Sequence, residues 1–253
     1  MSLLARARVL TLPLAFMALW QLTSGVLVPS LASALPPPSK VLADAWGVLA
    51  SGDLLVNVAH SLWRVLGGVA AAVALGIPVG VGIGLSPLFE DIVDPVVEFL
   101  RPIPPIAWIP LGILWFGIGD TQNMFIIFLG AFFPIVLNTI AGVRAVDRSL
   151  VWAALTLGGN RRQIIKEIVL PGALPLILTG CRIGVGVGWM ALVAAELVAA
   201  RSGLGFMIQT ARYAMVTQRV ILGMAVIGLL GLLMDRAMRW LERRTVPWSM
   251  VAR

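Results

Sequence analysis

The chain has very few of the side chains that build disulfides, metal sites and nucleotide-binding loops. Its 253 residues include one cysteine, Cys181, and one histidine, His60. Disulfide frameworks and zinc sites need several such residues at short spacing, so both kinds of site are excluded. Two lysines occur, Lys40 and Lys166, and neither follows a glycine, so the phosphate-binding pattern G-x-x-x-x-G-K-[ST] is absent. If ATP powers this protein, another chain must bind it.

Charged side chains are scarce as well. Lys and Arg together number 19 and Asp and Glu 12, so charged residues make up 12% of the chain while hydrophobic residues make up 59%. A soluble globular domain carries about 25% charged residues, which cover its water-facing surface. Together with a mean hydropathy of +0.97, this composition predicts a membrane protein. At about 20 apolar residues per spanning helix, the length allows at most about eight spans.

The net charge of +7 does not indicate a nucleic-acid partner. Basic patches that bind phosphate backbones lie on solvated surfaces, whereas the arginines of this chain cluster between apolar runs. In a membrane protein such clusters indicate which loops lie in the cytoplasm. We therefore expect no nucleic-acid binding.

We predict an all-α polytopic membrane protein that forms a single transmembrane domain over residues 1–253. Its six expected spans lie at about residues 9–28, 62–85, 95–119, 123–142, 173–200 and 220–240. The first could instead be the apolar region of a signal peptide, because Ala32-Ser33-Ala34 resembles a cleavage site; its near-complete bilayer length favours an uncleaved helix. Six spans put both termini on one side, where most basic residues then fall, which predicts cytoplasmic termini.

The third expected span contains four prolines within the membrane thickness, which are Pro102, Pro104, Pro105 and Pro110. Each proline lacks a backbone N–H, and lipid offers no partner to the carbonyls that this frees. We therefore expect a broken helix that is shielded by protein or faces a water-filled path. A re-entrant or interfacial stretch is the alternative. A short acidic loop, residues 86–94, is expected to precede this segment.

Glycines recur every four residues in two of the expected spans. They are Gly76, Gly80 and Gly84 in the second span and Gly180, Gly184 and Gly188 in the fifth. This spacing places each set on one helical face. Such a face lets another helix approach closely, so we expect helix packing, with a pore-lining face as the alternative.

The longest polar interruption, residues 143–172, has the pattern of two short helices joined at a glycine hinge. Ser149 is the expected cap of the first helix, and Gly158 with Gly159 ends it, because glycine adopts positive φ at low cost. Asn160 and Gln163 match a capping box at the start of the second helix. A compact helical feature of this kind suits docking of another protein rather than catalysis.

Residues 152–171, WAALTLGGNRRQIIKEIVLP, resemble the EAA loop of binding-protein-dependent ABC importer permeases. The matching positions are Ala153, Ala154, Gly158, Ile168, Leu170 and Pro171. Trp152 stands where the family has a Glu, so this chain lacks a charge at the expected contact with the ATPase. The resemblance implies that these residues and Arg161 form a cytoplasmic coupling loop.

The resemblance covers nearly the whole chain from about residue 30. Residues 101–119 and 170–200 are similar to the nitrate/sulfonate/taurine branch of these permeases. The chain looks most like taurine permeases through residues 186–207, GVGWMALVAAELVAARSGLGFM, and through Val246-Pro247-Trp248. The resemblance implies a permease fold of the type I ABC importer class. It also implies a small anionic or zwitterionic solute, such as taurine, another sulfonate or nitrate.

The same resemblance implies the partners. Two permease copies, by default a homodimer, would form the path through the lipid of the bacterial cytoplasmic (inner) membrane. Two ATP-binding subunits would hold ATP and Mg²⁺ and dock on the coupling loops. A periplasmic or lipid-anchored binding protein would deliver the substrate from the periplasm. No cofactor or metal would bind this chain itself.

Several residues within the expected spans are candidates for the translocation path. They are Arg101, Pro104, Trp108, Asn138, Arg182, Trp189 and Glu196. A charge at membrane depth costs about 2.5–3.5 kcal/mol on insertion scales, so each charged side chain should face protein or water. The structural alternatives are snorkelling arginines, interfacial tryptophans and a structural or gate-closing role for Glu196. Arg182 and Glu196 would lie about 21 Å apart along one helix and could not pair, whereas Glu98 and Arg101 could.

Two other classes of function compete with an ATP-driven permease. A secondary transporter also uses broken helices, but this sequence has few carboxylates or histidines within its spans to relay protons. A membrane enzyme would need clustered catalytic side chains, which one cysteine and one histidine do not provide.

Overall fold

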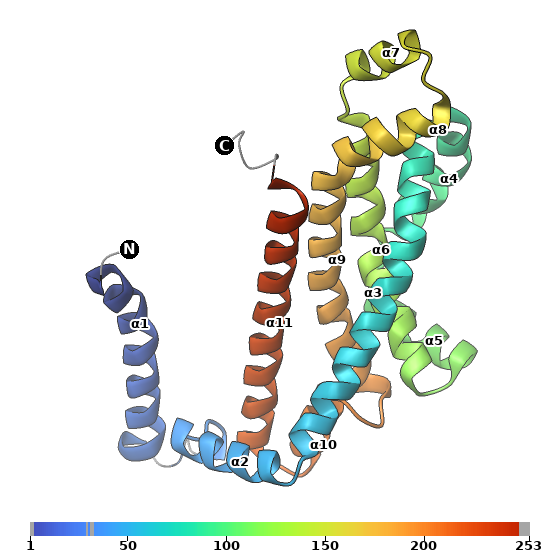
Figure 1. The fold of residues 1–253 in the computed structure, drawn as a ribbon. Coiled ribbons are helices and arrows are strands. Elements are labelled where there is room, and N and C mark those ends of the chain that lie inside the picture. Colours follow the sequence, from blue (N-terminus) through green and yellow to red (C-terminus); the bar gives the residue numbers. More distant parts are fainter. Residues whose placement is uncertain (1–2, 29, 31–32, 248–253) are drawn as a thin grey trace. The chain divides into compact units, whose positions relative to one another are not determined.

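The structure is a computed structural model that describes residues 3–28, 30 and 33–247, with side chains described from residue 11 onward. Every regular element in these residues is a helix, which confirms the predicted all-α class (Figure 1). The elements are α1 (Leu3–Leu22), η1 (Thr23–Leu27), α2 (Pro38–Ala50), α3 (Asp53–Leu85), α4 (Pro87–Leu100), η3 (Pro105–Trp108), α5 (Ile109–Phe116), α6 (Asp120–Arg144), α7 (Arg148–Thr156), α8 (Arg161–Ile164), η4 (Ile165–Val169), α9 (Leu170–Ala199), α10 (Leu204–Tyr213) and α11 (Thr217–Thr245). Ala32 and Trp248, which the sequence singled out, lie outside the described residues.

Four helices in the described part of the chain are long and apolar enough to cross a bilayer. They are Asp53–Leu85, Asp120–Arg144, Arg161–Ala199 and Thr217–Thr245. The helix pair Pro87–Leu100 and Pro105–Phe116 adds a fifth if the pair counts as one span. The first expected span corresponds to a shorter apolar helix, Thr11–Leu27. Six membrane crossings therefore stay a prediction. The four long helices, the bent pair and the shorter helix Thr11–Leu27 are the elements that would make them.

The third expected span is a bent pair of helices. The two parts, α4 and α5 with its preceding η3 turn, meet at 89°. Pro102 and Pro104 lie at the break, where the missing N–H groups interrupt helical bonding. The predicted break is thus confirmed, but the acidic loop expected at residues 86–94 is wrong. Ser86 caps a helix there, because its side chain accepts a hydrogen bond from the Phe89 amide and Pro87 occupies the first turn.

The chain divides into two compact units, one of Met1–His60 with Ser202–Gly228 and the other of Ser61–Arg201 with Leu229–Arg253. In the first unit, polar contacts tie the short helices to the longer ones. The Arg219 guanidinium pairs with the Asp44 carboxylate at 3.0 Å, joining α11 to α2. The Gly203 amide donates to the Asn57 side chain at 2.8 Å, joining the start of α10 to α3.

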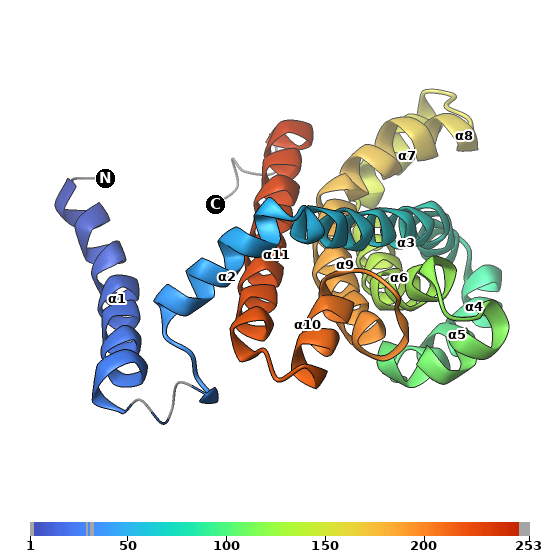
Figure 2. The ribbon, with the colours of Figure 1, turned by 90° about the horizontal axis from the view of Figure 1, so that it is seen from below.

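The second unit is built around α6, which lies beside α3 and α9 (Figures 1 and 2). The two glycine faces expected from the sequence, one on α3 and one on α9, both pack against α6. A Cβ atom at Gly80 of α3 would lie 2.6 Å from the Cβ of Thr139, and one at Gly180 of α9 would lie 2.7 Å from the Cβ of Asn138. Both distances are shorter than real contacts, so the helices fit only because these positions lack side chains. The packing interpretation of the glycines is therefore confirmed.

The bent pair packs on the same central helix. Val97 and Leu100 of α4 contact a cluster with Val136 and Ile140 of α6. The other half of the pair, α5, contributes Ile109 to a cluster that α6 and α9 complete. Figure 2 shows α4 and α5 beside α6. The break itself is not covered by this chain, because Pro102, Pro104 and Pro110 are exposed. The expectation that protein or a water-filled path shields this segment therefore stays a prediction.

The close fit at Gly180 gives a test with a matched control on the same helix. Replacing Gly180 with Ala should lower the free energy of unfolding by about 1–3 kcal/mol, because the added methyl group overpacks the contact with Asn138. Gly186, also in α9, has nothing within 4 Å of its Cβ position. Gly186→Ala should leave stability unchanged or slightly raised. Thermal unfolding of the purified variants measures both, and equal effects would contradict the packing assignment.

Candidate docking site and charge network

Helix α7 begins and ends through local signals. Its N-cap is Asp147, whose side chain accepts a hydrogen bond from the Ser149 amide at 2.9 Å. Ser149, the cap expected from the sequence, instead lies in the first turn. This hydrogen bond, with a further one from the Ser149 side chain, holds the pKa of Asp147 below its ordinary value. At the other end Gly158 has a φ of 83°, which confirms the predicted glycine hinge.

Helix α8 starts with the predicted capping box. The Asn160 side chain accepts from the Gln163 amide at 2.9 Å, and the Gln163 side chain accepts from the Asn160 amide at 3.0 Å. Residues 161–199 form one continuous helix, so the second expected short helix runs into the fifth expected span without a break, and the membrane boundary expected at residue 173 stays a prediction. A π turn, η4, precedes Pro171 at the place where proline's missing N–H interrupts α-helical bonding. The second short helix is thus the end of the membrane helix itself.

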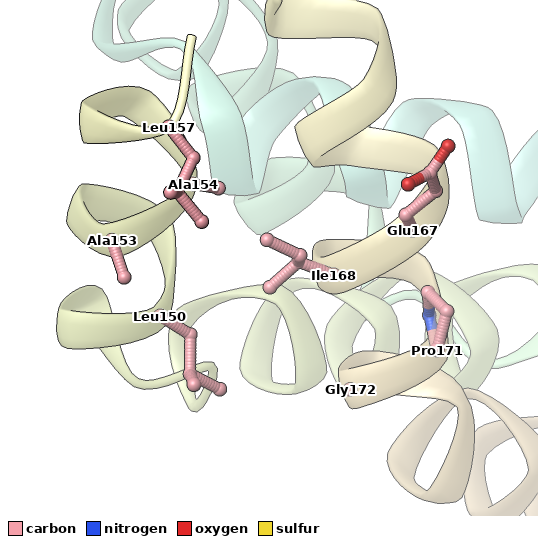
Figure 3. A pocket seen from close by; sticks show the side chains of 8 residues that line it. All are labelled: Leu150, Ala153, Ala154, Leu157, Glu167, Ile168, Pro171 and Gly172. Atoms are coloured by element: carbon pink, nitrogen blue, oxygen red, sulfur yellow. The ribbon is translucent and has the colours of Figure 1, made fainter. Parts of the chain in front are cut away.

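A groove of about 450 Å³ lies between α7 and the segment around Pro171 (Figure 3). Its lining is almost entirely apolar, and Glu167 is its one charged side chain. The lining residues are Leu150, Ala153, Ala154, Leu157, Glu167, Ile168, Pro171 and Gly172. Four of the predicted coupling residues, from α7, η4 and α9, therefore line one groove.

The surface of α7 is unusually apolar for an exposed helix. Leu157 is 88% exposed and Trp152 is 65% exposed. Exposed apolar patches of this kind mark interaction sites. Trp152, Gly158, Arg161 and Leu170 do not line the groove. Of these, Trp152, Gly158 and Arg161 are exposed, so they are accessible to a protein that docks on α7.

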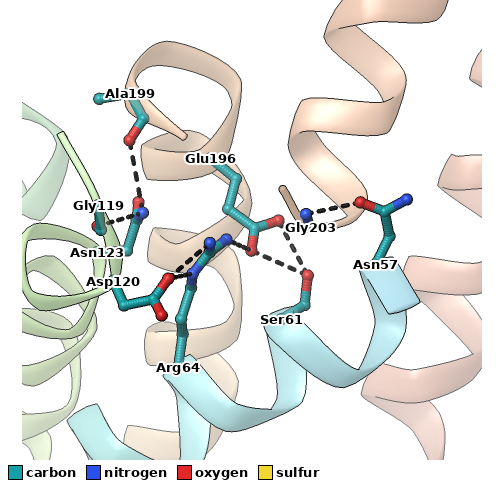
Figure 4. Close-up of polar contacts among 9 residues, drawn as sticks. All are labelled: Asn57, Ser61, Arg64, Gly119, Asp120, Asn123, Glu196, Ala199 and Gly203. Carbon is teal, nitrogen blue, oxygen red and sulfur yellow. Dashed lines mark hydrogen bonds and ion pairs between the residues drawn. The ribbon is translucent and has the colours of Figure 1, made fainter. Parts of the chain in front are cut away.

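A second polar feature lies within the second unit, where α3, α6 and α9 meet (Figure 4). Arg64 is 2% exposed and lies between two carboxylates. Its guanidinium pairs with Asp120 at 2.7 Å and with Glu196 at 2.7 Å. The Ser61 hydroxyl donates to both carboxylate oxygens of Glu196, at 2.9 and 3.0 Å. Glu196, a path candidate, is thus paired in this network, and its structural or gate-closing role stays a prediction.

Sequence reasoning did not select Arg64 as a candidate, although it lies within the second expected span. The positions of three charged residues along the expected spans could have predicted this network. Arg64 and Asp120 lie near the first residues of the second and fourth expected spans, and Glu196 lies near the end of the fifth. Alternating span directions put all three at the same side of the membrane, where they could pair.

The remaining charged path candidates have separate surroundings. Arg182 pairs with Glu242 of α11 at 3.2 Å, and both side chains are about one-third exposed. Arg101 is exposed at the break between α4 and α5, as is Pro104. The expected pair of Glu98 and Arg101 is wrong, because no ion pair joins them in the described residues. Glu98 and Arg101 fall at the last turn of α4 and just beyond it, where the chain bends.

The uncharged candidates Asn138, Trp108 and Trp189 make contacts within this chain, and their place on the path stays a prediction. The Asn138 amide donates to the Pro134 carbonyl of its own helix at 2.8 Å. Trp189 is 6% exposed, and a Cβ at Gly231 of α11 would lie 3.1 Å from its indole nitrogen. The interpretation of Trp189 as an interfacial anchor is therefore wrong. Trp108 is half-buried against the cluster that contains Ile109 and Ala191.

Residues 72–247 match the family model of the binding-protein-dependent transport system inner membrane component. The chain belongs to this family. It is 45% identical to the taurine transport system permease protein TauC of Escherichia coli (strain K12) over 220 residues, which cover 85% of this chain and 80% of that protein. It is 38% identical to the putative aliphatic sulfonates transport permease protein SsuC of Bacillus subtilis (strain 168), over 94% of this chain and 86% of that one. The nitrate import permease protein NrtB of Synechocystis sp. is 33% identical over 91% of this chain and 86% of its own length.

Solved structures show the same fold. An inward-facing MetNI methionine ABC transporter matches with a TM-score of 0.66 and 21% identity, over 75% of this chain and 94% of that one. An amino acid ABC transporter crystallised with histidines matches with a TM-score of 0.65 and 17% identity, over 79% and 97%. The predicted type I ABC importer permease fold is confirmed. The chain is an ABC transporter permease of the taurine, sulfonate and nitrate branch, and hence an inner-membrane transport subunit.

The charge network predicts an asymmetry between two arginines of this permease. Arg64→Gln should lower the free energy of unfolding by about 3 kcal/mol, because it leaves the Glu196 carboxylate buried without its guanidinium. Arg182→Gln removes a partly exposed pair and should cost less than about 1 kcal/mol. Thermal unfolding of the two purified variants compares them. Equal losses would mean that Arg64 does not neutralise a buried charge.

Proposed function

We propose that this permease imports taurine or a related sulfonate from the periplasm into the cytoplasm, driven by ATP that partner subunits bind and hydrolyse. The main support is the groove between α7 and the segment around Pro171. Residues that resemble the EAA loop line this apolar groove, and the exposed apolar surface of α7 lies beside it. Identities of 45% to TauC and 38% to SsuC support a sulfonate substrate. Nitrate or another small anion is the alternative, which the 33% identity to NrtB keeps open.

The continuous helix supports a mechanical route from the groove to the far end of α9. Residues 161–199 number 39, so at 1.5 Å per residue the helix is about 58 Å long. Its first part lines the groove through Ile168 and Pro171, and its last part carries Glu196 in the charge network. A partner that pulls on the groove would move the start of this helix. Through the continuous helix the movement would reach Glu196, shift it against Arg64 of α3, and thereby open or close the path between the helices.

The partners follow from the family and from what the chain lacks. Two ATP-binding subunits would hold ATP and Mg²⁺, because this sequence lacks the G-x-x-x-x-G-K-[ST] pattern. A second copy of this chain would complete the path as a homodimer, and a periplasmic binding protein would deliver the solute. Both termini would lie in the cytoplasm, since the arginine-rich stretches then face that side.

Arg64 is unsuited to hold the transported anion in the conformation described here. Two carboxylates already neutralise its guanidinium, at 2.7 Å each. An entering sulfonate would have to displace one of them. Selectivity for the solute would therefore come mainly from the binding protein, while this chain supplies the path and the coupling.

Growth of a deletion strain tests the substrate. The strain should fail to use taurine as its only sulfur source and should recover when this gene is restored. A simple alkanesulfonate as sulfur source and nitrate as nitrogen source are measured in parallel. A defect confined to nitrate would contradict the sulfonate assignment but keep the permease mechanism.

Gly158 offers a test of the coupling site with a matched control. Its φ of 83° is unfavourable for any side chain, by about 1–2 kcal/mol. Gly158→Val should reduce uptake by about tenfold or more and weaken association with the ATPase, because it distorts the end of α7. Gly52 has nearly the same φ, 82°, and equally open space around its Cβ, but lies between α2 and α3. Gly52→Val should retain ATPase association. If Gly158→Val also retains both uptake and ATPase association, the coupling assignment is wrong.

A further inference from the structure

A polar cavity of about 540 Å³ lies in the second unit, next to the expected coupling loop at residues 143–172, which we call the docking loop. It shares no lining residue with the groove of Figure 3. The end of α3, the start of α4, the end of α6 and the start of α7 surround it. Its charged lining consists of Arg144, Arg148 and Glu90. None of these residues lines the groove under α7.

The charges of this cavity do not cancel. Arg144 pairs with Glu90 at 2.7 Å, and both side chains are more than one-third exposed. Exposed pairs of this kind are weak, so another anion can share Arg144. Arg148 has no ion pair in the part of the chain that the structure describes. The nearby Asp147 carboxylate is held by the Ser149 amide and does not line the cavity.

Part of the cavity's lining is apolar. Ile83 and Leu85 of α3 and Val143 of α6 line it, together with Val169. Leu85 and Arg144 are the last residues of two helices that can span a bilayer. The cavity therefore lies where the apolar stretches end, which is the depth of lipid headgroups.

We propose that this cavity binds a phosphate group, which Arg148 and Arg144 hold, and that the phosphate belongs to the headgroup of an anionic phospholipid. The planar guanidinium matches the geometry of phosphate oxygens. The apolar part of the lining suits the glycerol and upper acyl chain of a lipid better than it suits a free ion. The assignment of the cavity to the cytoplasmic side, where anionic lipid would meet it, rests on the proposed function.

Binding would act on the docking loop. Arg144 ends α6 and Arg148 begins α7, so one phosphate that contacts both bridges the three-residue connection between them. The bridge fixes the start of α7 relative to α6. A lipid in this cavity therefore steadies the surface on which the ATPase would dock.

Hydrogen exchange in reconstituted vesicles tests the site. The transporter assembled from this chain and its ATPase is placed in vesicles of phosphatidylcholine alone, in vesicles that also contain phosphatidylglycerol, and in phosphatidylcholine vesicles with added inorganic phosphate. Phosphatidylglycerol should slow exchange of the α7 amides by about tenfold, as hydrogen bonds to a charged group would. Arg148→Gln should abolish this protection, and Arg148→Lys should restore part of it. Arg243→Gln removes the same charge from exposed α11 outside the cavity and should leave the protection intact.

Each other outcome has a defined meaning. Equal protection by inorganic phosphate supports the phosphate site but overturns its assignment to lipid. Protection by neither additive, or protection that survives Arg148→Gln, overturns the site. If Arg148→Gln instead releases the ATPase in every vesicle, with no dependence on lipid, the cavity serves the ATPase and the proposal fails.

Uptake by the same vesicles, supplied with the binding protein, separates this inference from the proposed function. Sulfonate uptake without lipid-dependent protection of α7 overturns the phosphate site alone. Lipid-dependent protection without uptake of taurine, alkanesulfonate or nitrate overturns the proposed function alone.

Discussion

The close approach of α3 and α9 to α6 is the constraint on which the second unit depends. Lipid gives apolar helices little hydrophobic reason to associate, so they rely on closely fitting faces. Glycines such as Gly80 and Gly180 remove the side chains that would hold the helices apart, and α6 fills the space with its own. The positions of the bent pair and of the charge network both follow, because each is built against these three helices.

Neutralisation of charge is the second requirement that the membrane imposes. Arg64 meets it with two carboxylates from two other helices, so the network also ties α3, α6 and α9 together. Glu196 lies at one end of the continuous helix 161–199, whose other end carries the groove under α7. One continuous stretch of helix thus connects the docking surface with the charged contact.

Features set by neighbouring residues could be predicted from the sequence. The hinge at Gly158 and the capping box of Asn160 and Gln163 depend only on local backbone chemistry, and both are present. Prediction was wrong where two local signals competed. Asp147 and Ser149 both cap helices well, and the acidic residues after Ser86 fit a loop as well as the first turns of α4. In each case the hydrogen bond that forms in the structure shows which signal prevails.

The sequence by itself determined the class of protein, the breaks at its prolines, the glycine faces and the resemblance of its docking loop. These follow from composition, helical periodicity and local spacing, which are properties of one segment at a time. Only the tertiary structure decided that Arg64 is neutralised between Asp120 and Glu196, and that Trp189 is buried rather than interfacial. The physical reason is that burial and charge pairing depend on which helix faces which, and that is settled by packing between segments far apart in the chain.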